Sequence, residues 1–352
     1  MDILTSGTGR VPLNVGIIGC GEVAQVVHIP TLSYMSSWFR ITYLCDFSEA
    51  ALKHCAAKIP GTVKTTRNPE LLCTSEDVDV ILVASSDEYH AEHALAALKH
   101  HKHVLVEKSL ALTKKDIGTI AEAERHSRGS VMVGYMRRYA APVEDAIREV
   151  GGMDKVFYAP VRDIIGANLT FVNQSGTFPE RFTDFRSEHS ANKTARHEQA
   201  VNGAPAECGD VPVTKESSLA WRVLCGLGSH DLSLTREVLG MPTSVKGSSL
   251  GYPFWNDLFK YPGFTVSYES GIDNNPRFDA HLEGLPVTMH IAENYNGTYK
   301  EATIRKTYED PYTHELKEWW NSVTQGMGPK TTTRDAAQDL EIFGMAMKHH
   351  YG

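Results

Sequence analysis

The segment from Leu13 to Ala24 constrains the fold of this chain more than any other part of it. It reads L-N-V-G-I-I-G-C-G-E-V-A, an apolar run followed by the pattern G-x-G-x-x-A, whose fixed positions are Gly19, Gly21 and Ala24. In dinucleotide-binding folds the first residue permits a tight turn and the second lets a pyrophosphate approach the backbone. The small third residue keeps the helix close to the sheet. The segment therefore predicts a strand, a phosphate-binding turn and a helix.

An acidic residue stands where such folds bind the adenosine ribose. Asp46 follows the next apolar run, Phe39–Cys45, and its carboxylate can accept hydrogen bonds from the ribose hydroxyls. The same negative charge would repel the 2′-phosphate of NADP, and Phe47 and Ser48 offer no arginine to bind that phosphate. We therefore expect NAD as the cofactor, with NADP as the less favoured alternative.

Length, charge and cysteine content limit the class of protein and its partners. With 352 residues, of which 41% are hydrophobic and 22% charged, the chain is typical of a globular protein of about two domains. A formal net charge of −8 provides no cationic surface for nucleic acid. No apolar run approaches the ~20 residues that span a bilayer. Six scattered cysteines and an N-terminus without an apolar signal segment predict free thiols and a cytoplasmic protein.

Strand and helix patterns alternate between residues 13 and 150. Apolar runs typical of buried parallel strands occur at Val15–Ile18, Ile41–Cys45, Val78–Ala84, Val104–Val106 and Val131–Val133. Helical spacing of apolar residues is found in Ser48–Lys58, Glu88–Lys99 and Lys114–His126. Such repeated units predict an α/β fold with a doubly wound parallel sheet, here a Rossmann domain over 13–150 after a flexible stretch at 1–12.

The pattern changes after Gly151, where longer and partly alternating strands are expected. They are Val156–Val161, Val245–Leu250, Phe264–Tyr268, Val287–Ile291 and Ala302–Arg305. Helices are expected at His230–Leu239, His314–Thr324 and Ala336–His349. This succession predicts an α+β domain over 151–352 for substrate binding and oligomerisation, with a largely antiparallel open sheet and helices on one face.

Residues 164–217 form an insertion without clean periodicity that exceeds the usual loop length of compact domains. Four phenylalanines in this segment are interleaved with arginine and histidine, which argues against full disorder. We expect an ordered flap over the active site or a subunit contact. A disordered surface insertion is the alternative.

Two residues have the chemistry to act on an alcohol. Lys108 follows an apolar run at the carboxyl edge of the predicted sheet, where ligands bind, and its ammonium can stabilise an alkoxide. His230, at the start of a predicted helix, is suited to take an alcohol proton near neutral pH. The alternatives are an exposed pair of Glu107 with Lys108, and a histidine whose hydrogen bonds are satisfied by the backbone.

From Leu13 to His349 the chain resembles the glucose–fructose oxidoreductase, inositol dehydrogenase and MocA family of NAD(P)-dependent oxidoreductases. Besides G-x-G-x-x-A, the similar segments are S-S-D-E-Y-H at 85–90, where relatives have T-P-N-x-x-H, E-K at 107–108, G-Y-M-R-R-Y at 134–139 and G-x-H at 228–230. The resemblance implies hydride transfer between a nicotinamide and a secondary alcohol or ketone of a sugar, polyol or related hydroxy compound. Lys108 and His230 would then be catalytic. The resemblance also implies a homo-oligomer, a dimer or tetramer, formed through the open face of the second sheet.

On this basis we expect the cofactor to be bound by Gly19, Gly21, Glu22, Val23, Asp46, Ser85, Ser86, His90, Glu107, Lys108 and Arg138. Substrate contacts are expected from Tyr135 and from three residues where the first strand of the second domain meets the insertion, Arg162, Asp163 and Asn168. No metal is expected, because the histidines between 90 and 103 match no metal-binding spacing and the reaction needs none. The expected partner is a small-molecule substrate, with no nucleic acid and no membrane.

Two positions depart from the family pattern. Relatives carry Asp four residues before the histidine, as D-x-G-x-H, whereas this chain has Gly226. Asp231 or Asp163 could take over the orienting of the imidazole. Relatives also have proline after the lysine, with a cis bond before it in some of them, whereas this chain has Ser109. Either the bond before Ser109 is trans and Lys108 sits differently, or the surroundings hold a cis bond.

Two other functions stay open beside the dehydrogenase. One is a redox-neutral enzyme that keeps NAD bound, oxidises its substrate transiently and then eliminates, epimerises or hydrolyses it, as NAD-dependent glycosidases similar to this family do. The other is a non-catalytic sensor that binds dinucleotide and regulates a partner. The glycine at 226 and the long insertion both agree with a sensor.

Overall fold

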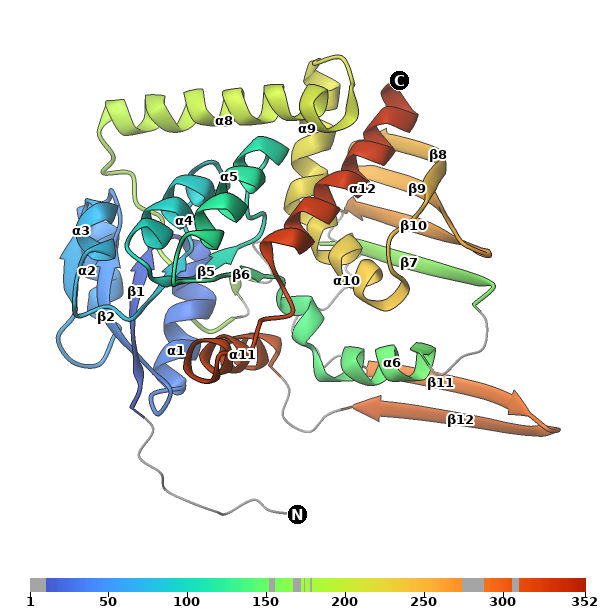
Figure 1. Ribbon diagram of the computed structural model, residues 1–352, viewed down its shortest axis with the longest axis horizontal. Helices are drawn as coiled ribbons and strands as arrows, with labels where there is room; N and C mark the ends of the chain where they lie inside the picture. Colours follow the sequence, from blue (N-terminus) through green and yellow to red (C-terminus); the bar gives the residue numbers. More distant parts are fainter. Residues whose placement is uncertain are drawn as a thin grey trace.

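The computed structural model describes residues 11–151, 156–166, 172–173, 175–177, 179–273, 288–305 and 310–352. Its N-terminal half holds a six-stranded parallel sheet, and its C-terminal half holds a separate, mostly antiparallel sheet (Figure 1). The predicted fold class is therefore confirmed. None of the helices in the described part of the chain is long and apolar enough to cross a membrane.

The parallel sheet has the strand order β3-β2-β1-β4-β5-β6. Its strands are β1 (Leu13–Ile18), β2 (Phe39–Cys45), β3 (Lys64–Thr66), β4 (Val80–Val83), β5 (His103–Glu107) and β6 (Val131–Gly134). All four residues of β4 are buried, as expected for a central strand with both faces covered. The chain order reverses between β1 and β4, so a crevice opens beyond their carboxyl ends, where open α/β sheets bind ligands.

Helices on both faces of the sheet connect these strands, and two more helical segments follow the last strand. They are η1 (Ala24–His28), α1 (Ile29–Tyr34), α2 (Glu49–Ala56), α3 (Pro69–Cys73), η2 (Asp87–Tyr89), α4 (His90–Lys99), α5 (Lys114–Arg125), η3 (Met136–Tyr139) and α6 (Ala141–Gly151). The start of α2 is set by Ser48, whose hydroxyl accepts the N–H of Ala51, and Thr113 caps α5 in the same way. The predicted helices at 48–58, 88–99 and 114–126 correspond to α2, α4 and α5.

The second sheet has the order β7-β10-β9-β8, with β7 (Tyr158–Ile165), β8 (Ser244–Gly251), β9 (Phe254–Tyr261) and β10 (Phe264–Ile272). β7 runs parallel to β10, and the other neighbours are antiparallel. α10 (Ser229–Leu239) and α12 (Thr333–Tyr351) lie between this sheet and the parallel sheet, and no described helix covers its other face (Figure 1). A hairpin of β11 (Thr288–Tyr295) and β12 (Thr298–Arg305) stands apart beside α6, and α11 (Pro311–Gln325) packs near α1.

Two helices that the sequence pattern did not predict are α8 (Ser187–Gly209), which lies within the insertion, and α9 (Lys215–Val223), which begins at its end. α8 crosses the top of the molecule above α4 and α5 (Figure 1). It has no continuous apolar stripe and contains Pro205, so its sequence lacks the spacing that reveals a helix. The segment before it, residues 179–186, runs along the dinucleotide-binding half of the molecule.

Candidate active site

The turn after β1 has the shape that a dinucleotide requires. Gly19 adopts φ +106°, and a Cβ there would come within 2.4 Å of the carbonyl oxygen of Ala84. Apart from its two chain neighbours, no heavy atom of the described residues lies within 4 Å of the position that a Cβ would take at Gly21. Bare backbone therefore faces open space beside the start of the following helix, whose free N–H groups favour an anion.

A cavity of about 430 Å³ opens at this turn. One wall comes from seven of the residues expected to bind the cofactor, Gly19, Gly21, Glu22, Val23, Asp46, Ser85 and Ser86. The opposite wall includes four residues of the insertion, Phe185, His189, Ser190 and Lys193. Sequence reasoning missed these four, because no local pattern places the insertion here. The residues present fit a dinucleotide, with a bare glycine turn and, hydrogen-bonded to that turn, the carboxylate of Asp46.

The carboxylate of Asp46 is fixed in orientation at the edge of this cavity. It accepts the backbone N–H of Cys20 at 2.7 Å and that of Ser48 at 2.8 Å. Burial raises the pKa of Asp46, while these backbone hydrogen bonds oppose the shift. Each carboxylate oxygen has a further lone pair, so Asp46 can still accept a hydrogen bond from a ribose hydroxyl.

Lys108 lies in the loop after β5, and its peptide bond to Ser109 is cis, which decides between the two geometries that the sequence allowed. Its Nζ donates to the carbonyl oxygen of Gly226 at 2.7 Å, and the Ser109 hydroxyl donates to that of Cys225 at 2.6 Å. Both carbonyls belong to η4 (Leu224–Gly228), a π-helical turn. Burial lowers the pKa of Lys108, although the negative charges of Glu107 and other carboxylates oppose this.

Two further side chains hold the loop that carries Lys108. Glu107 lies 2.7 Å from Nε2 of His28 and accepts the backbone N–H of Lys108 at 3.3 Å. Burial alone would raise the pKa of Glu107. The hydrogen bond with His28 and the positive charge of Lys108 outweigh this effect, so the pKa of Glu107 is lowered. Nδ1 of His90 lies 2.7 Å from the carbonyl oxygen of Ser109, and its Nε2 lies 2.8 Å from a second carbonyl. Neither Glu107 nor His90 lines the dinucleotide cavity.

His230 lies in the first turn of α10. Its Nδ1 is buried, and no residue in the described part of the chain gives it a hydrogen bond. Burial lowers the pKa of His230 well below its usual range, and the positive charges of Lys108 and Arg137 lower it further. The imidazole is therefore neutral at pH 7 and can accept a proton.

Arg137 binds both carboxylates that the sequence offered as replacements for the missing aspartate. Its Nη1 donates to Asp163 at 2.6 Å and also to Asp231. The hydroxyl of Tyr268 donates to the other oxygen of Asp231 at 3.2 Å. Burial raises the pKa of Asp231, and the neighbouring Asp163 raises it further against the charge of Arg137. These carboxylates are thus engaged with Arg137 and Tyr268, and neither of them accepts a hydrogen bond from Nδ1 of His230.

Four of the residues expected at the site lie elsewhere or outside the described residues. Arg138 is 5% exposed within a network of ion pairs, and Tyr135 is fully buried, so both are packed inside the protein away from the cavity. Arg162 is exposed on β7 and lies 3.7 Å from Glu269. Asn168 lies outside the described residues. The sequence led us to expect Arg138, the second arginine of the R-R pair, at the site. The first one, Arg137, is the arginine that binds Asp163 and Asp231 there.

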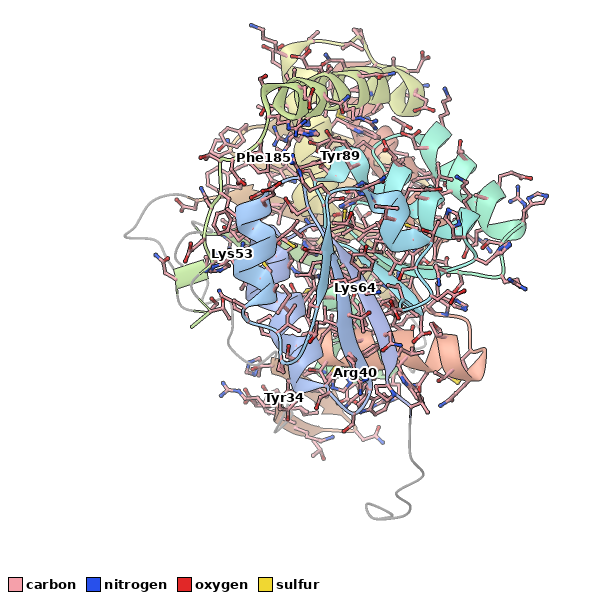
Figure 2. The ribbon with its side chains drawn as sticks, turned by 90° about the vertical axis from the view of Figure 1, so that its left-hand side faces the viewer. Tyr34, Arg40, Lys53, Lys64, Tyr89 and Phe185 are labelled. Atoms are coloured by element: carbon pink, nitrogen blue, oxygen red, sulfur yellow. The ribbon has the colours of Figure 1, made fainter. Side chains whose placement is uncertain are left out.

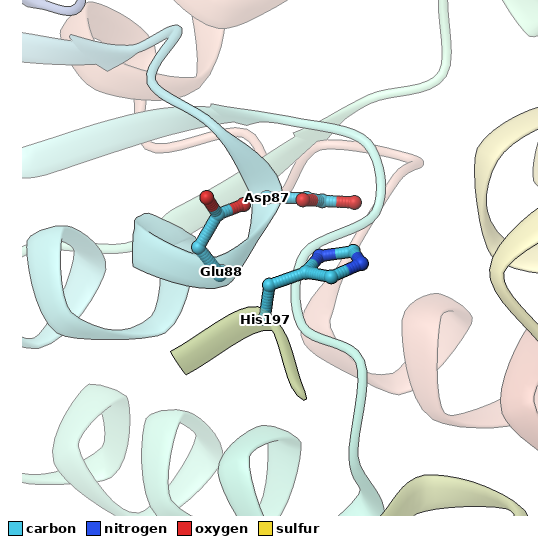
Figure 3. Close-up of side chains that lie close together, drawn as sticks. All are labelled: Asp87, Glu88 and His197. Atoms are coloured by element: carbon cyan, nitrogen blue, oxygen red, sulfur yellow. The ribbon is translucent and has the colours of Figure 1, made fainter. Parts of the chain in front are cut away.

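Two carboxyl groups and an imidazole meet next to the cavity (Figure 3). Asp87 and Glu88 come from η2 and His197 from α8, and their possible ligand atoms lie within 4.8 Å of one another. Burial and the hydrogen bond with Asp87 raise the pKa of Glu88 to about 7. Burial alone would raise the pKa of Asp87. The hydrogen bond from Glu88 and nearby positive charges outweigh this effect, so the pKa of Asp87 is lowered. The two carboxyls therefore share a proton near neutral pH, an arrangement that requires no bound ion.

Comparison with known proteins identifies the family. Residues 13–135 match the family model described as oxidoreductase family, NAD-binding Rossmann fold. The chain is 39% identical to inositol 2-dehydrogenase 2 of Saccharopolyspora erythraea over 337 residues, which cover 89% of this chain and 86% of that protein. It is 31% identical to inositol 2-dehydrogenase of Paracoccus denitrificans over 275 residues, which cover 70% of this chain and 81% of that protein.

Solved structures share the fold at lower identity. A myo-inositol 2-dehydrogenase from Lactobacillus plantarum is 17% identical with a TM-score of 0.66, covering 96% of this chain and 97% of that one. KijD10, a 3-ketoreductase from Actinomadura kijaniata in complex with NADP and TDP-benzene, is 15% identical with a TM-score of 0.69. The match covers 97% of this chain and 98% of that one. The sequence match with an inositol dehydrogenase along most of both chains shows more than a shared fold. The chain belongs to the glucose–fructose oxidoreductase, inositol dehydrogenase and MocA family of oxidoreductases.

Proposed function

We propose that this chain is an NAD-dependent dehydrogenase that oxidises a secondary alcohol of a sugar, polyol or related hydroxy compound, or reduces the matching ketone. The observation that carries the proposal is the neutral His230 close to the ammonium of Lys108, beyond the carboxyl ends of the strands that border the dinucleotide cavity. The names of the relatives, inositol 2-dehydrogenases, support a polyol or sugar as the substrate class.

NAD is the proposed cofactor, bound by the residues of the Rossmann half that line the cavity. The bare turn at Gly19 and Gly21 fits the pyrophosphate, and the fixed carboxylate of Asp46 fits the ribose hydroxyls. When bound, the nicotinamide supplies the hydride acceptor, which no side chain can provide. The role of the chain is to hold the alcohol, move its proton and stabilise the charge on its oxygen.

Lys108 and His230 divide the work on the substrate oxygen. During oxidation the O–H proton passes to His230, the C–H bond breaks with its electron pair leaving as hydride, and the C=O bond forms. The ammonium of Lys108 donates a hydrogen bond to the same oxygen and stabilises its developing negative charge. One of the three N–H groups of Lys108 is used by Gly226, so two remain for the substrate.

The absorbance of NADH tests the proposal directly. The purified protein is offered NAD⁺ and NADP⁺ separately with inositols, aldoses, sugar acids and simple hydroxy acids, and growth of absorbance with one substrate class is expected. Lys108→Met and His230→Ala should each lower kcat/KM by about 10²–10⁴-fold without loss of NAD⁺ binding. Lys114→Met, at an exposed lysine, is the matched control. Near-normal turnover by both site variants would refute the assigned roles.

A homodimer through the open face of the second sheet is also proposed. Tyr158 of β7 and Phe254 and Leu258 of β9 are 57%, 42% and 38% exposed on that face, which supports a covered surface in the assembled protein. Light scattering of the purified protein should give twice the chain mass, and Leu258→Lys should shift it toward the monomer. A monomer at every concentration would rule out this assembly.

A further inference from the structure

The insertion is fixed to the dinucleotide-binding half by contacts far apart in sequence. Nε2 of Gln25 donates to the carbonyl oxygen of Glu180 at 3.1 Å, and the N–H of Glu180 donates back to the Gln25 side chain at 2.9 Å. Gln25 is only 2% exposed, so this pair is a rigid anchor. Figure 2 shows the segment beyond it, with Phe185 beside Tyr89 and above Lys53 of α2.

Within this segment, Asp184 reaches the N-terminus of α2. Its carboxylate accepts the Ser48 hydroxyl and the backbone N–H of Ala50, the latter at 3.1 Å. Ser48 and Ala50 stand two and four positions after Asp46 in the chain, and Asp46 is the residue positioned for the ribose hydroxyls. A group attached to the 2′ position of that ribose would extend toward these residues. Asp184 therefore occupies the N–H and O–H donors that such a group would need.

The carboxylate of Asp184 carries a negative charge at neutral pH. Its hydrogen bonds with Ser48 and Ala50 lower the pKa of Asp184, so the carboxylate is ionised at neutral pH. Its negative charge in turn contributes to the raised pKa of Asp46, after the larger effect of burial. Two carboxylates thus lie close together around Ser48 at the start of α2, and one of them, Asp46, lines the cavity. The nearby cation Arg181 lies 3.4 Å from Glu22, which partly neutralises its charge.

We propose that Asp184 is a second specificity residue of the cofactor site, which excludes NADP by occupying the donors of α2 and by repelling a 2′-phosphate. This inference rests on the proposed dinucleotide-dependent function and assigns part of its specificity to the insertion. Asp46 alone can favour NAD through the ribose hydroxyls. Asp184 adds the exclusion, because a phosphate would have to displace a carboxylate that is already hydrogen-bonded and of the same charge.

Calorimetric titration of NAD⁺ and NADP⁺ into the full-length protein, without substrate, tests this role. Asp184→Asn removes the charge and keeps one oxygen, which can accept a hydrogen bond from Ser48 or from Ala50. The affinity for NADP⁺ is expected to rise about tenfold, because a 2′-phosphate with about two negative charges loses a like-charged neighbour. The affinity for NAD⁺ should stay nearly unchanged, since it carries no phosphate at that position.

Two further variants separate charge at this position from other effects. Glu198→Gln removes one negative charge from an exposed position of α8 and should leave both affinities unchanged. Asp184→Ala also removes the hydrogen-bond acceptor, and NADH is expected to dissociate faster from it in stopped-flow fluorescence. Equal NADP⁺ affinity of the unmodified protein and Asp184→Asn, with NAD⁺ binding intact, would overturn the inference and leave the proposed function standing. Failure of the unmodified protein to bind either dinucleotide would refute the proposed function itself.

Discussion

Gly226→Asp would restore the carboxylate that relatives carry four residues before the histidine, and the structure leaves room for it. Apart from its chain neighbours and the backbone of its own helix, no heavy atom of the described residues lies within 4 Å of the position of a Cβ at Gly226. Residues four apart lie on the same face of a helix, and the helical segment from η4 into α10 carries both Gly226 and His230. The new carboxylate would therefore lie on the side of the helix that carries the unpartnered imidazole.

The expected effect is a rise in the pKa of His230. Burial and the charges of Lys108 and Arg137 now hold this pKa well below its usual range. A carboxylate about 5 Å away attracts an imidazolium by about 3 kcal/mol at an effective dielectric constant of about 20, equivalent to about two pKa units. Because Gly226 is exposed and Lys108 would pair with the same carboxylate, we expect about half of this, a rise of about one unit.

Nuclear magnetic resonance of protein with isotope-labelled histidine, saturated with NAD⁺, measures this shift without any substrate. The His230 signal is identified by its absence from His230→Ala. Gly226→Asn has nearly the same size without the charge and should leave the titration of His230 where it is in the unmodified protein. Identical titration curves in Gly226→Asp and Gly226→Asn would refute the placement of residue 226 beside the imidazole.

Three other changes test separate parts of the site. Asp46→Ser should weaken the preference for NAD⁺ over NADP⁺ in calorimetric titration, and little change in the ratio would count against its assignment to the ribose. Gly19→Ala should abolish dinucleotide binding and lower the melting temperature, because a Cβ at φ +106° would meet the backbone at 2.4 Å; normal binding would contradict the geometry of the turn. The pKa of Glu88 is raised from 4.5 to about 7 on folding, so the stability it contributes below pH 4.5 is lost as the pH rises through about 7. Glu88→Gln should therefore remove part of the fall in melting temperature between about pH 4.5 and about pH 7, and identical pH profiles would exclude this carboxyl pair as the cause.

The parts of the fold that the sequence predicted are those where burial leaves a continuous pattern. β4 is recognisable because all its residues are buried and apolar, whereas β3 is a short polar edge strand without an apolar run. β9 was missed although its side chains alternate between exposed and buried faces, because the buried Asp257 stands where the pattern calls for an apolar residue. Polar residues in buried positions hide a strand from periodicity.

The site was predictable only where function depends on local geometry. The turn at Gly19 was found because the need for glycine there is set by its own backbone and one neighbouring strand. Arg137 and Arg138 stand next to each other, and which one faces the site depends on the turn of η3, which no spacing rule reveals. Asp184 reaches α2 across 136 positions of sequence through polar contacts, and such contacts leave no hydrophobic periodicity.

The low pKa of His230 predicts opposite pH dependences for the two directions of the reaction. In oxidation the imidazole must be neutral, and because its pKa lies well below 6.5, kcat/KM for the alcohol should stay level across neutral pH. In reduction the same imidazole must first be protonated, so kcat/KM for the ketone should rise by about tenfold for each pH unit lowered until the pKa of His230 is reached. Both profiles are measured by NADH absorbance with one alcohol and its ketone. A reduction rate independent of pH between about 6 and about 8 would show that the proton comes from a group that stays protonated, and Lys108 would then replace His230 as the proton donor.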